Sequence, residues 1–341
     1  MMMRIQFCIV VIIFVGIAAE KNHNEHEHAR LCSVLGAAVD KWRDIRTRDP
    51  TDTLRKALGR TIFGNESGGE LTDLEGTLPK EYNGVEGISG SRSSWCGGPH
   101  EETNWQHQWR WSGHSAPHDM ACLCTVGEEA WPVNKSATTT DNDKLCGQGR
   151  SALGADDSKG WGYTEHEGNR HVEATWKAIV TPCLLESGKK DDLKKALEVF
   201  IDNLNHTYDK EYRDMYRLGE GKYSSTHYAA CTGSSSLGVC VMYYTSFPPE
   251  PWWRQLQEAI LEDEQIQKRL AEEEKKRKQQ DKTEKEDSAQ KAALTSGTQT
   301  NNQTEQHRNA NLTEKLRKLN LTSGTPISMP SSWLLRAVFL F

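Results

Sequence analysis

The sequence predicts a mainly α-helical ectodomain over residues 20–264, whose middle is a loop-rich lobe stapled by disulfides. Two segments carry apolar residues at alternating spacings of three and four, which is the stripe of a coiled-coil helix. A glycine-rich stretch with most of the cysteines separates these segments. The chain has 341 residues, 11 tryptophans and a formal net charge of −6, so it can build a core, and nucleic acid is disfavoured as a partner.

Residues 1–19 have the organisation of a secretory signal peptide. Arg4 supplies the positive start, an apolar run extends from Ile5 to Ile17, and Ala18-Ala19 provides small residues for cleavage. The alternative is an N-terminal membrane anchor, but the apolar run is short for a spanning helix. We therefore expect the mature chain to begin near residue 20 and to fold in an oxidising compartment.

The first helix is predicted over residues 25–45. Cys32, Leu35, Val39 and Trp42 form its stripe, and Pro50 bends or ends the chain after it. From residue 59 to about residue 169 the periodicity fails and glycine becomes frequent, which predicts the loop-rich lobe.

A second helical region is predicted from Arg170, with an interruption at Ser187-Gly188. After the interruption a second coiled-coil-type stripe predicts a helix that runs to about Tyr216, and Gly219 ends it. A third helix is predicted to open at Trp252. The second stripe consists of Leu193, Leu197, Phe200, Leu204 and Tyr208.

Eight cysteines remain once Cys8 is removed with the signal peptide, and an even number in a secreted chain predicts four disulfides. Cys122 and Cys124 form a C-x-C that would suit zinc inside a cell, but two separate disulfides are the commoner use in a secreted chain. The segment from Cys231 to Cys240 resembles a local disulfide loop, and the other pairings stay open. The eight are Cys32, Cys96, Cys122, Cys124, Cys146, Cys183, Cys231 and Cys240.

Residues 265–323 are polar and carry both charge signs, which predicts a solvated helix that fades into a largely disordered stalk. Six N-x-S/T sequons predict N-linked glycans, and three of them lie in this stalk. The sequons are Asn65, Asn134, Asn205, Asn302, Asn311 and Asn320.

Residues 324–341 follow the pattern of a glycosylphosphatidylinositol (GPI) attachment signal that is removed on anchoring. The small residues Thr322, Ser323 and Gly324 precede a polar spacer and a short apolar tail from Trp333 to Phe341. We expect Ser323 to accept the anchor, with Gly324 as the alternative. A C-terminal strand or amphipathic helix in a secreted protein is the other interpretation of this tail.

No catalytic, cofactor or metal site is predicted. His114, His118 and Asp119 suggest an acid/base pair, but no nucleophile motif accompanies them. The His23, His26 and His28 tract is a conceivable metal site without a second ligand cluster. Six tryptophans could stack on sugars, although packing against disulfides is the commoner use. They are Trp95, Trp105, Trp109, Trp111, Trp131 and Trp161.

The chain resembles the variant surface glycoproteins (VSGs) of African trypanosomes, closest to the congolense type. The block WRWSGHSAPHDMACLCT at 109–125 carries the resemblance, together with LCG at 145–147, GWGY at 160–163 and the small-residue triplet at 322–324. The resemblance covers roughly residues 20–341. The absence of cysteine after Cys240 departs from the better-known brucei pattern, as does the short tail.

The resemblance implies an elongated N-terminal domain with two long antiparallel coiled-coil helices, which associates as a homodimer. It also implies a GPI-anchored coat on the outer leaflet, at the extracellular face of the plasma membrane. Such a coat shields the cell and varies its exposed loops to evade host antibody. The alternative on the same scaffold is a receptor for host transferrin or haptoglobin–haemoglobin, or an invariant surface glycoprotein. The polar, glycine-rich residues 64–98 favour the coat.

Overall fold

The computed structural model describes residues 20–86, 90–100, 108–134, 143–162, 168–185, 192–226 and 229–295, without the side chains of 86, 284 and 286–295. By its internal contacts the chain divides into two units, 1–271 and 272–341. The predicted signal peptide, Ser323, Gly324 and the sequons at Asn302, Asn311 and Asn320 lie outside the described residues.

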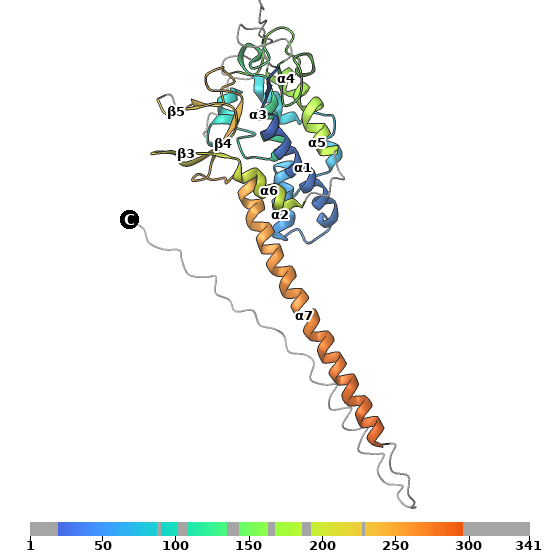
Figure 1. Cartoon of the computed structure of the whole chain (residues 1–341). Helices are drawn as coiled ribbons and strands as arrows, with labels where there is room; N and C mark the ends of the chain where they lie inside the picture. Colours follow the sequence, from blue (N-terminus) through green and yellow to red (C-terminus); the bar gives the residue numbers. More distant parts are fainter. Residues whose placement is uncertain are drawn as a thin grey trace, which may run out of the picture. The chain divides into compact units, whose positions relative to one another are not determined.

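The first predicted helix is confirmed as α1 (Glu25–Ile45) (Figure 1). It packs against α2, α5 and α6, with Leu35, Val39 and Trp42 of its stripe buried and Cys32 half-buried. Asn24 precedes α1 in the left-handed region and is itself buried. Its side-chain amide donates to Leu123 O and Val239 O, and its oxygen accepts from Glu220 N. One buried asparagine therefore holds the start of α1 to two distant segments.

α2 (Thr53–Phe63) begins at an Asp52 cap, whose carboxylate accepts a hydrogen bond from Arg55 N at 2.8 Å. It ends at Gly64, whose φ of 73° is the left-handed conformation that favours glycine.

The loop-rich lobe is confirmed between α2 and residue 162, where the regular elements are short. It contains the helical turns η1 (Leu71–Asp73), η2 (Lys80–Glu86), η3 (Ser93–Gly97), η4 (Glu128–Ala130) and η5 (Ser151–Leu153). Its one longer helix among the described residues is α3 (Ala116–Cys124). Strand β1 (Asn22–His23) pairs in parallel with β2 (Lys144–Leu145), which ties the lobe to the start of α1.

The second helical region is confirmed only in part. It contains α4 (Gly168–Thr175), the π-helical turn η6 (Trp176–Val180), α5 (Thr181–Leu185) and α6 (Leu193–Asp202). The predicted continuation of α6 to Tyr216 is wrong. Residues beyond α6 form β3 (Asn205–Asp209) and β4 (Arg213–Gly219), which join β7 (Cys240–Tyr244) in an antiparallel sheet of order β3-β4-β7. A second antiparallel pair joins β5 (Tyr223–Ser224) to β6 (Ala229–Ala230).

The stripe fails after Leu204 because its last member does not face the core. Leu204 is buried, but Tyr208 is 66% exposed. Met215 is buried and pairs with Tyr244 of β7, so pairing with a strand far along the chain decides the conformation of this segment.

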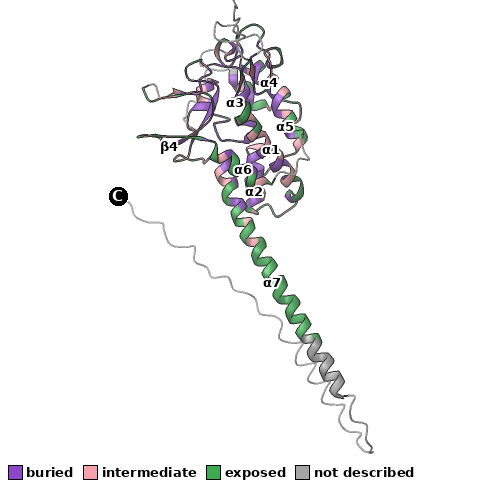
Figure 2. Ribbon diagram, viewed as in Figure 1, coloured by how far each residue is buried: buried purple, intermediate pink, exposed green. Residues whose placement is uncertain are grey.

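The third predicted helix is confirmed as α7 (Trp252–Thr295), which is longer than expected. Its first turns bury Trp252, Trp253 and Leu256, and its described side chains from Ala271 onward are exposed (Figure 2). The predicted domain boundary at residue 264 falls inside this helix, whose exposed part is the solvated helix expected at the start of the stalk. Glutamate, lysine, glutamine and alanine favour helix without burial, and Glu274–Lys278 adds a 2.6 Å ion pair. Among the described residues, no helix combines the length and apolar character needed to cross a membrane.

All eight expected cysteines form disulfides, in the pairs Cys32–Cys183, Cys96–Cys122, Cys124–Cys146 and Cys231–Cys240. The first pair joins α1 to α5 across 151 residues, whereas the last closes a local loop of nine. This difference in span determines how strongly each bridge restricts the unfolded chain.

Removal of the long bridge by a Cys32→Ala/Cys183→Ala double substitution should lower the free energy of unfolding by up to about 5 kcal/mol. The matched Cys231→Ala/Cys240→Ala variant should lose only about 3 kcal/mol, because its loop is short. Urea unfolding of both variants and the parent chain measures the two losses. An equal loss, or a larger one for the short loop, would contradict the prediction.

Candidate functional site

The block that carries the resemblance folds into α3, and every residue of this helix is buried. Ser115 caps it: the hydroxyl accepts a hydrogen bond from His118 N at 3.3 Å, and Pro117 lies in the first turn. The helix packs against α1, α2, α4 and β7. A helix enclosed on all sides must satisfy its polar side chains and both of its ends inside the protein.

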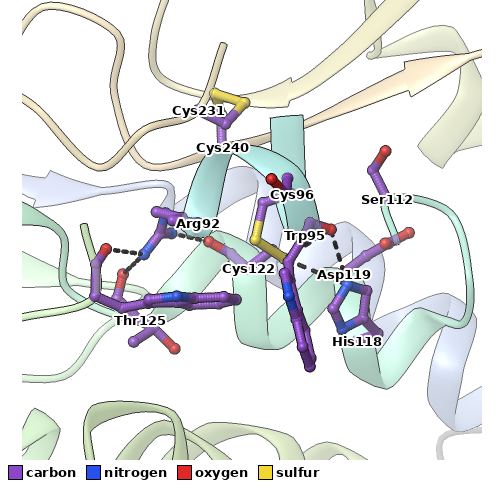
Figure 3. Close-up of a disulfide and its surroundings, with 12 residues drawn as sticks. Arg92, Trp95, Cys96, Ser112, His118, Asp119, Cys122, Thr125, Cys231 and Cys240 are labelled. Carbon is purple, nitrogen blue, oxygen red and sulfur yellow. Dashed lines mark hydrogen bonds between the residues drawn. A yellow bond between two sulfur atoms is a disulfide. The ribbon is translucent and has the colours of Figure 1, made fainter. Parts of the chain in front are cut away.

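Two disulfides fasten α3 to different parts of the lobe. Cys122 joins Cys96 in η3 (Figure 3), and Cys124 joins Cys146 just beyond β2. Residues two apart on a helix point about 200° apart around its axis, so the two sulfurs face nearly opposite directions. The prediction of two separate disulfides at this C-x-C is confirmed.

Arg92 stabilises the C-terminal end of α3 (Figure 3). Its guanidinium is fully buried and donates to the carbonyl oxygens of Cys122 and Thr125, the latter at 2.9 Å. It also stacks over the Trp161 ring, 5.2 Å from the centroid. A cation at this end of a helix satisfies carbonyls without helical partners and complements the helix dipole. Burial lowers the pKa of Arg92 to about 9, so the group is still cationic at neutral pH.

His118 and Asp119 are adjacent in α3 but bind different partners. The Tyr82 hydroxyl lies 2.8 Å from His118 Nδ1, and Nε2 lies 3.1 Å from Trp95 O. Because a carbonyl can only accept, Nε2 carries the proton and Nδ1 accepts from the tyrosine. Burial, with a smaller effect of the Arg110 charge, lowers the pKa of His118 to about 3. The imidazole is therefore a neutral packing group and not a partner for the Asp119 carboxyl.

Asp119 connects α3 to the start of α7. Its carboxyl accepts from Gly113 N at 2.8 Å and from Trp252 Nε1 at 2.7 Å, and Trp252 is the first residue of α7. Burial raises the pKa of Asp119 to about 7, while these two hydrogen bonds act in the opposite direction. The side chain has no exposed surface, so it fastens two elements and is closed to a substrate.

The other predicted candidates are dispersed. Asn65 and Asn205 are exposed, Asn134 is half-buried, and Asn205 lies on β3 instead of the helix expected there. The histidine tract does not form one site. His23 is buried with Nδ1 2.7 Å from Glu220, and His28 lies beside the Cys32–Cys183 bridge. The sulfurs of that bridge are covalently paired, so they offer no thiolate to a metal.

Sequence reasoning missed Arg92 and the structural part played by Asp119. Arg92 follows serine and glycine residues in a stretch that looks like an exposed loop. Asp119 and Trp252 are 133 residues apart, so no local pattern connects them. For Arg92 the sequence offers one signal, a basic residue close to tryptophans and cysteines, and this signal is too common to predict a buried cation.

An Asp119→Asn substitution should change how stability depends on pH. The pKa of Asp119 lies above its ordinary value of 3.8, so this group's contribution is fully present below that pH and is lost as pH rises towards 7. Asparagine does not titrate. The variant should therefore gain roughly 4 kcal/mol relative to the parent between about pH 4 and pH 7.

Urea unfolding of both proteins across this range measures that gain. The pKa values of His114 and His118 are lowered by burial, so these groups give the opposite slope, but they are common to both proteins and cancel in the difference. A difference that stays constant with pH would contradict the prediction.

Comparison with known proteins agrees with the resemblance noted in the sequence. A family model described as the trypanosomal VSG domain matches residues 36–285, from within α1 into α7. No curated protein matches the chain. The matched region includes α3 and the three-stranded sheet β3-β4-β7. It also contains seven of the eight disulfide-bonded cysteines, because Cys32 lies just before it. The chain therefore belongs to the trypanosomal variant surface glycoprotein family.

Proposed function

We propose that this trypanosome surface coat glycoprotein is GPI-anchored at the extracellular face of the plasma membrane, where it undergoes antigenic variation. The observation that carries the proposal is the match of the VSG domain to residues 36–285. The small-residue triplet at 322–324 and the apolar tail support the anchor. Host antibodies would bind the exposed loops. The congolense-like subtype is a further part of this proposal.

The coat is an exclusion layer that needs no chemistry, so we propose that the chain is not an enzyme and uses no cofactor. In the described part of the chain, His118 and Asp119 of α3 have strongly shifted pKa values, and both side chains are closed to solvent. Their environment supports a packing role. Such a protein needs a stable core beneath a surface that tolerates substitution.

The coat is favoured over a receptor because, among the described residues, the large exposed apolar side chains are spread over several elements. They lie on separate elements: Trp109 in the lobe, Leu185 on α5, Val199 on α6, Tyr208 on β3, and Leu261 and Leu270 on α7. A receptor for a host macromolecule would present a contiguous patch.

Treatment of intact cells with phosphatidylinositol-specific phospholipase C should release the protein as a dominant surface species, because the enzyme cuts the lipid from a GPI anchor. Quantification of the freed chain per cell measures this. Release in small amounts would instead support the receptor. Protein that appears in the medium without phospholipase treatment would contradict the anchor proposal.

We also propose a homodimer that uses one face of α7. Ala259 is buried, Ile266 is half-buried, and Leu270 is 53% exposed, and their spacing places them on one side of the helix. The apolar side of α7 therefore extends from the buried Ala259 to Leu270, where the rest of the chain no longer covers it. A second copy of α7 would cover Leu270.

The ectodomain should therefore sediment as a dimer at micromolar concentration, and Leu270→Lys should shift it to monomer. Leu261→Lys is the matched control, because Leu261 is similarly exposed but lies about 180° from Leu270 around the helix. A monomeric parent chain, or equal effects of the two substitutions, would count against this dimer.

A further inference from the structure

A pocket of about 730 Å³ lies directly beside the sequon at Asn65. Its volume is within the roughly 300–1,000 Å³ typical of small-molecule sites. The pocket is bounded by the turn after α2, by the lobe, and by the prolines that precede α7. Its lining residues are Arg60, Gly64, Asn65, Glu66, His100, Trp111, Pro248 and Pro249.

The turn after α2 presents the Asn65 side chain at the edge of this pocket. Asn65 is exposed, and its Oδ1 accepts a hydrogen bond from Ser67 N at 2.9 Å. This bond uses the carbonyl oxygen and leaves Nδ2, the atom that carries an N-linked sugar, outside the turn. The sequon Asn65-Glu66-Ser67 is therefore held in one conformation at the pocket edge.

The same turn contacts an aromatic wall, which consists of the rings of His114, Trp111 and His100. A Cβ at Gly64 would overlap the His114 ring, and the φ of 73° there also favours glycine. His114 packs edge-on against Trp111 with centroids 4.5 Å apart, and His100 packs on Trp111 at 4.2 Å. Because Gly64 contacts one end of this wall, its neighbour Asn65 lies within a short reach of Trp111, which lines the pocket.

The lining has the chemistry that a pyranose requires. The half-buried indole of Trp111 and the rings of Pro248 and Pro249 are apolar surfaces for the C–H face of a sugar. Arg60 supplies donors and Glu66 supplies acceptors for hydroxyl and acetamido groups. The hydrogen bond from Arg60 to Glu250 O uses one guanidinium nitrogen, and Glu66 is exposed.

We propose that this pocket holds the proximal N-acetylglucosamine residues of an N-glycan on Asn65. The proposal rests on the secretory route contained in the proposed function. Asn65 Nδ2 forms the bond to C1 of the first sugar and loses a proton, and the lipid diphosphate of the oligosaccharide donor leaves. The attached sugar then packs on Trp111, so the glycan is a fixed cover over this face and not a freely solvated chain.

The test uses the full chain made in a eukaryotic cell and freed from the cell surface by phosphatidylinositol-specific phospholipase C, and it measures release of each glycan by peptide N-glycosidase F. Cleavage converts the asparagine to aspartate, which mass spectrometry follows site by site. Release at Asn65 from the folded protein should be at least about tenfold slower than release after denaturation, the factor that about 1.4 kcal/mol of packing provides. The exposed sequon at Asn205 should show a much smaller difference.

Trp111→Leu should bring the folded rate at Asn65 close to the denatured rate. Trp109→Leu is the matched control, because Trp109 is 54% exposed and does not line the pocket. If Trp111→Leu fails to fold, the parent protein with ¹³C-labelled glycans provides a second measurement. Ring current from Trp111 should shift the protons of one N-acetylglucosamine upfield, and denaturation should remove the shift.

Equal release rates at Asn65 and Asn205 in the folded protein, or the absence of any ring-current shift, would overturn the proposal. A surface-anchored chain that carries glycans elsewhere but none at Asn65 would also overturn it and leave the coat proposal standing. A chain that stays inside the cell and carries no glycan would count against both.

Discussion

Complete burial of α3 is the constraint on which the rest of the ectodomain depends. No side chain of this helix reaches solvent, so each of its polar groups needs a partner inside the protein. Ser115 supplies the partner at its start and Arg92 at its end. His118 binds Tyr82 and Trp95, and Asp119 binds Gly113 and Trp252. These bonds draw the lobe, α3 and the start of α7 into one connected network.

The network explains how a lobe with few regular ladders keeps a defined shape. Short turns and glycine-rich segments bury little area of their own and lose much conformational entropy on folding. Two disulfides on α3 reduce that loss, and the buried rings of Trp95 and Trp161 pack edge to face in the core. The stabilising groups lie inside, so residues on the lobe surface are free of this task. A coat protein of this family needs that separation of a fixed interior from a tolerant exterior.

α7 combines two physical regimes in one helix. Its first turns are held by burial of Trp252 and Leu256 and by the bond from Trp252 to Asp119. Its later described side chains are exposed, and there the helix rests on propensity and on pairs of opposite charge. Composition alone cannot distinguish an exposed helix of this kind from a disordered stalk, because both bury almost nothing.

The sequence by itself determined the elements whose signal is local. The stripe from Cys32 to Trp42 placed α1 because burial of one helix face repeats every three or four residues. The cysteine count in a secreted chain indicated four disulfides, and the spacing of Cys231 and Cys240 indicated one of the pairs.

The tertiary structure alone decided everything that depends on distant partners. Pairing of Met215 with Tyr244 placed the continuation of the second stripe in strands, because pairing with a distant strand can override a local helical pattern. The three other disulfide pairs, the burial of Arg92 and the bond between Asp119 and Trp252 join segments far apart in the chain. Local periodicity carries no information about such contacts, because they are set only when the whole core packs.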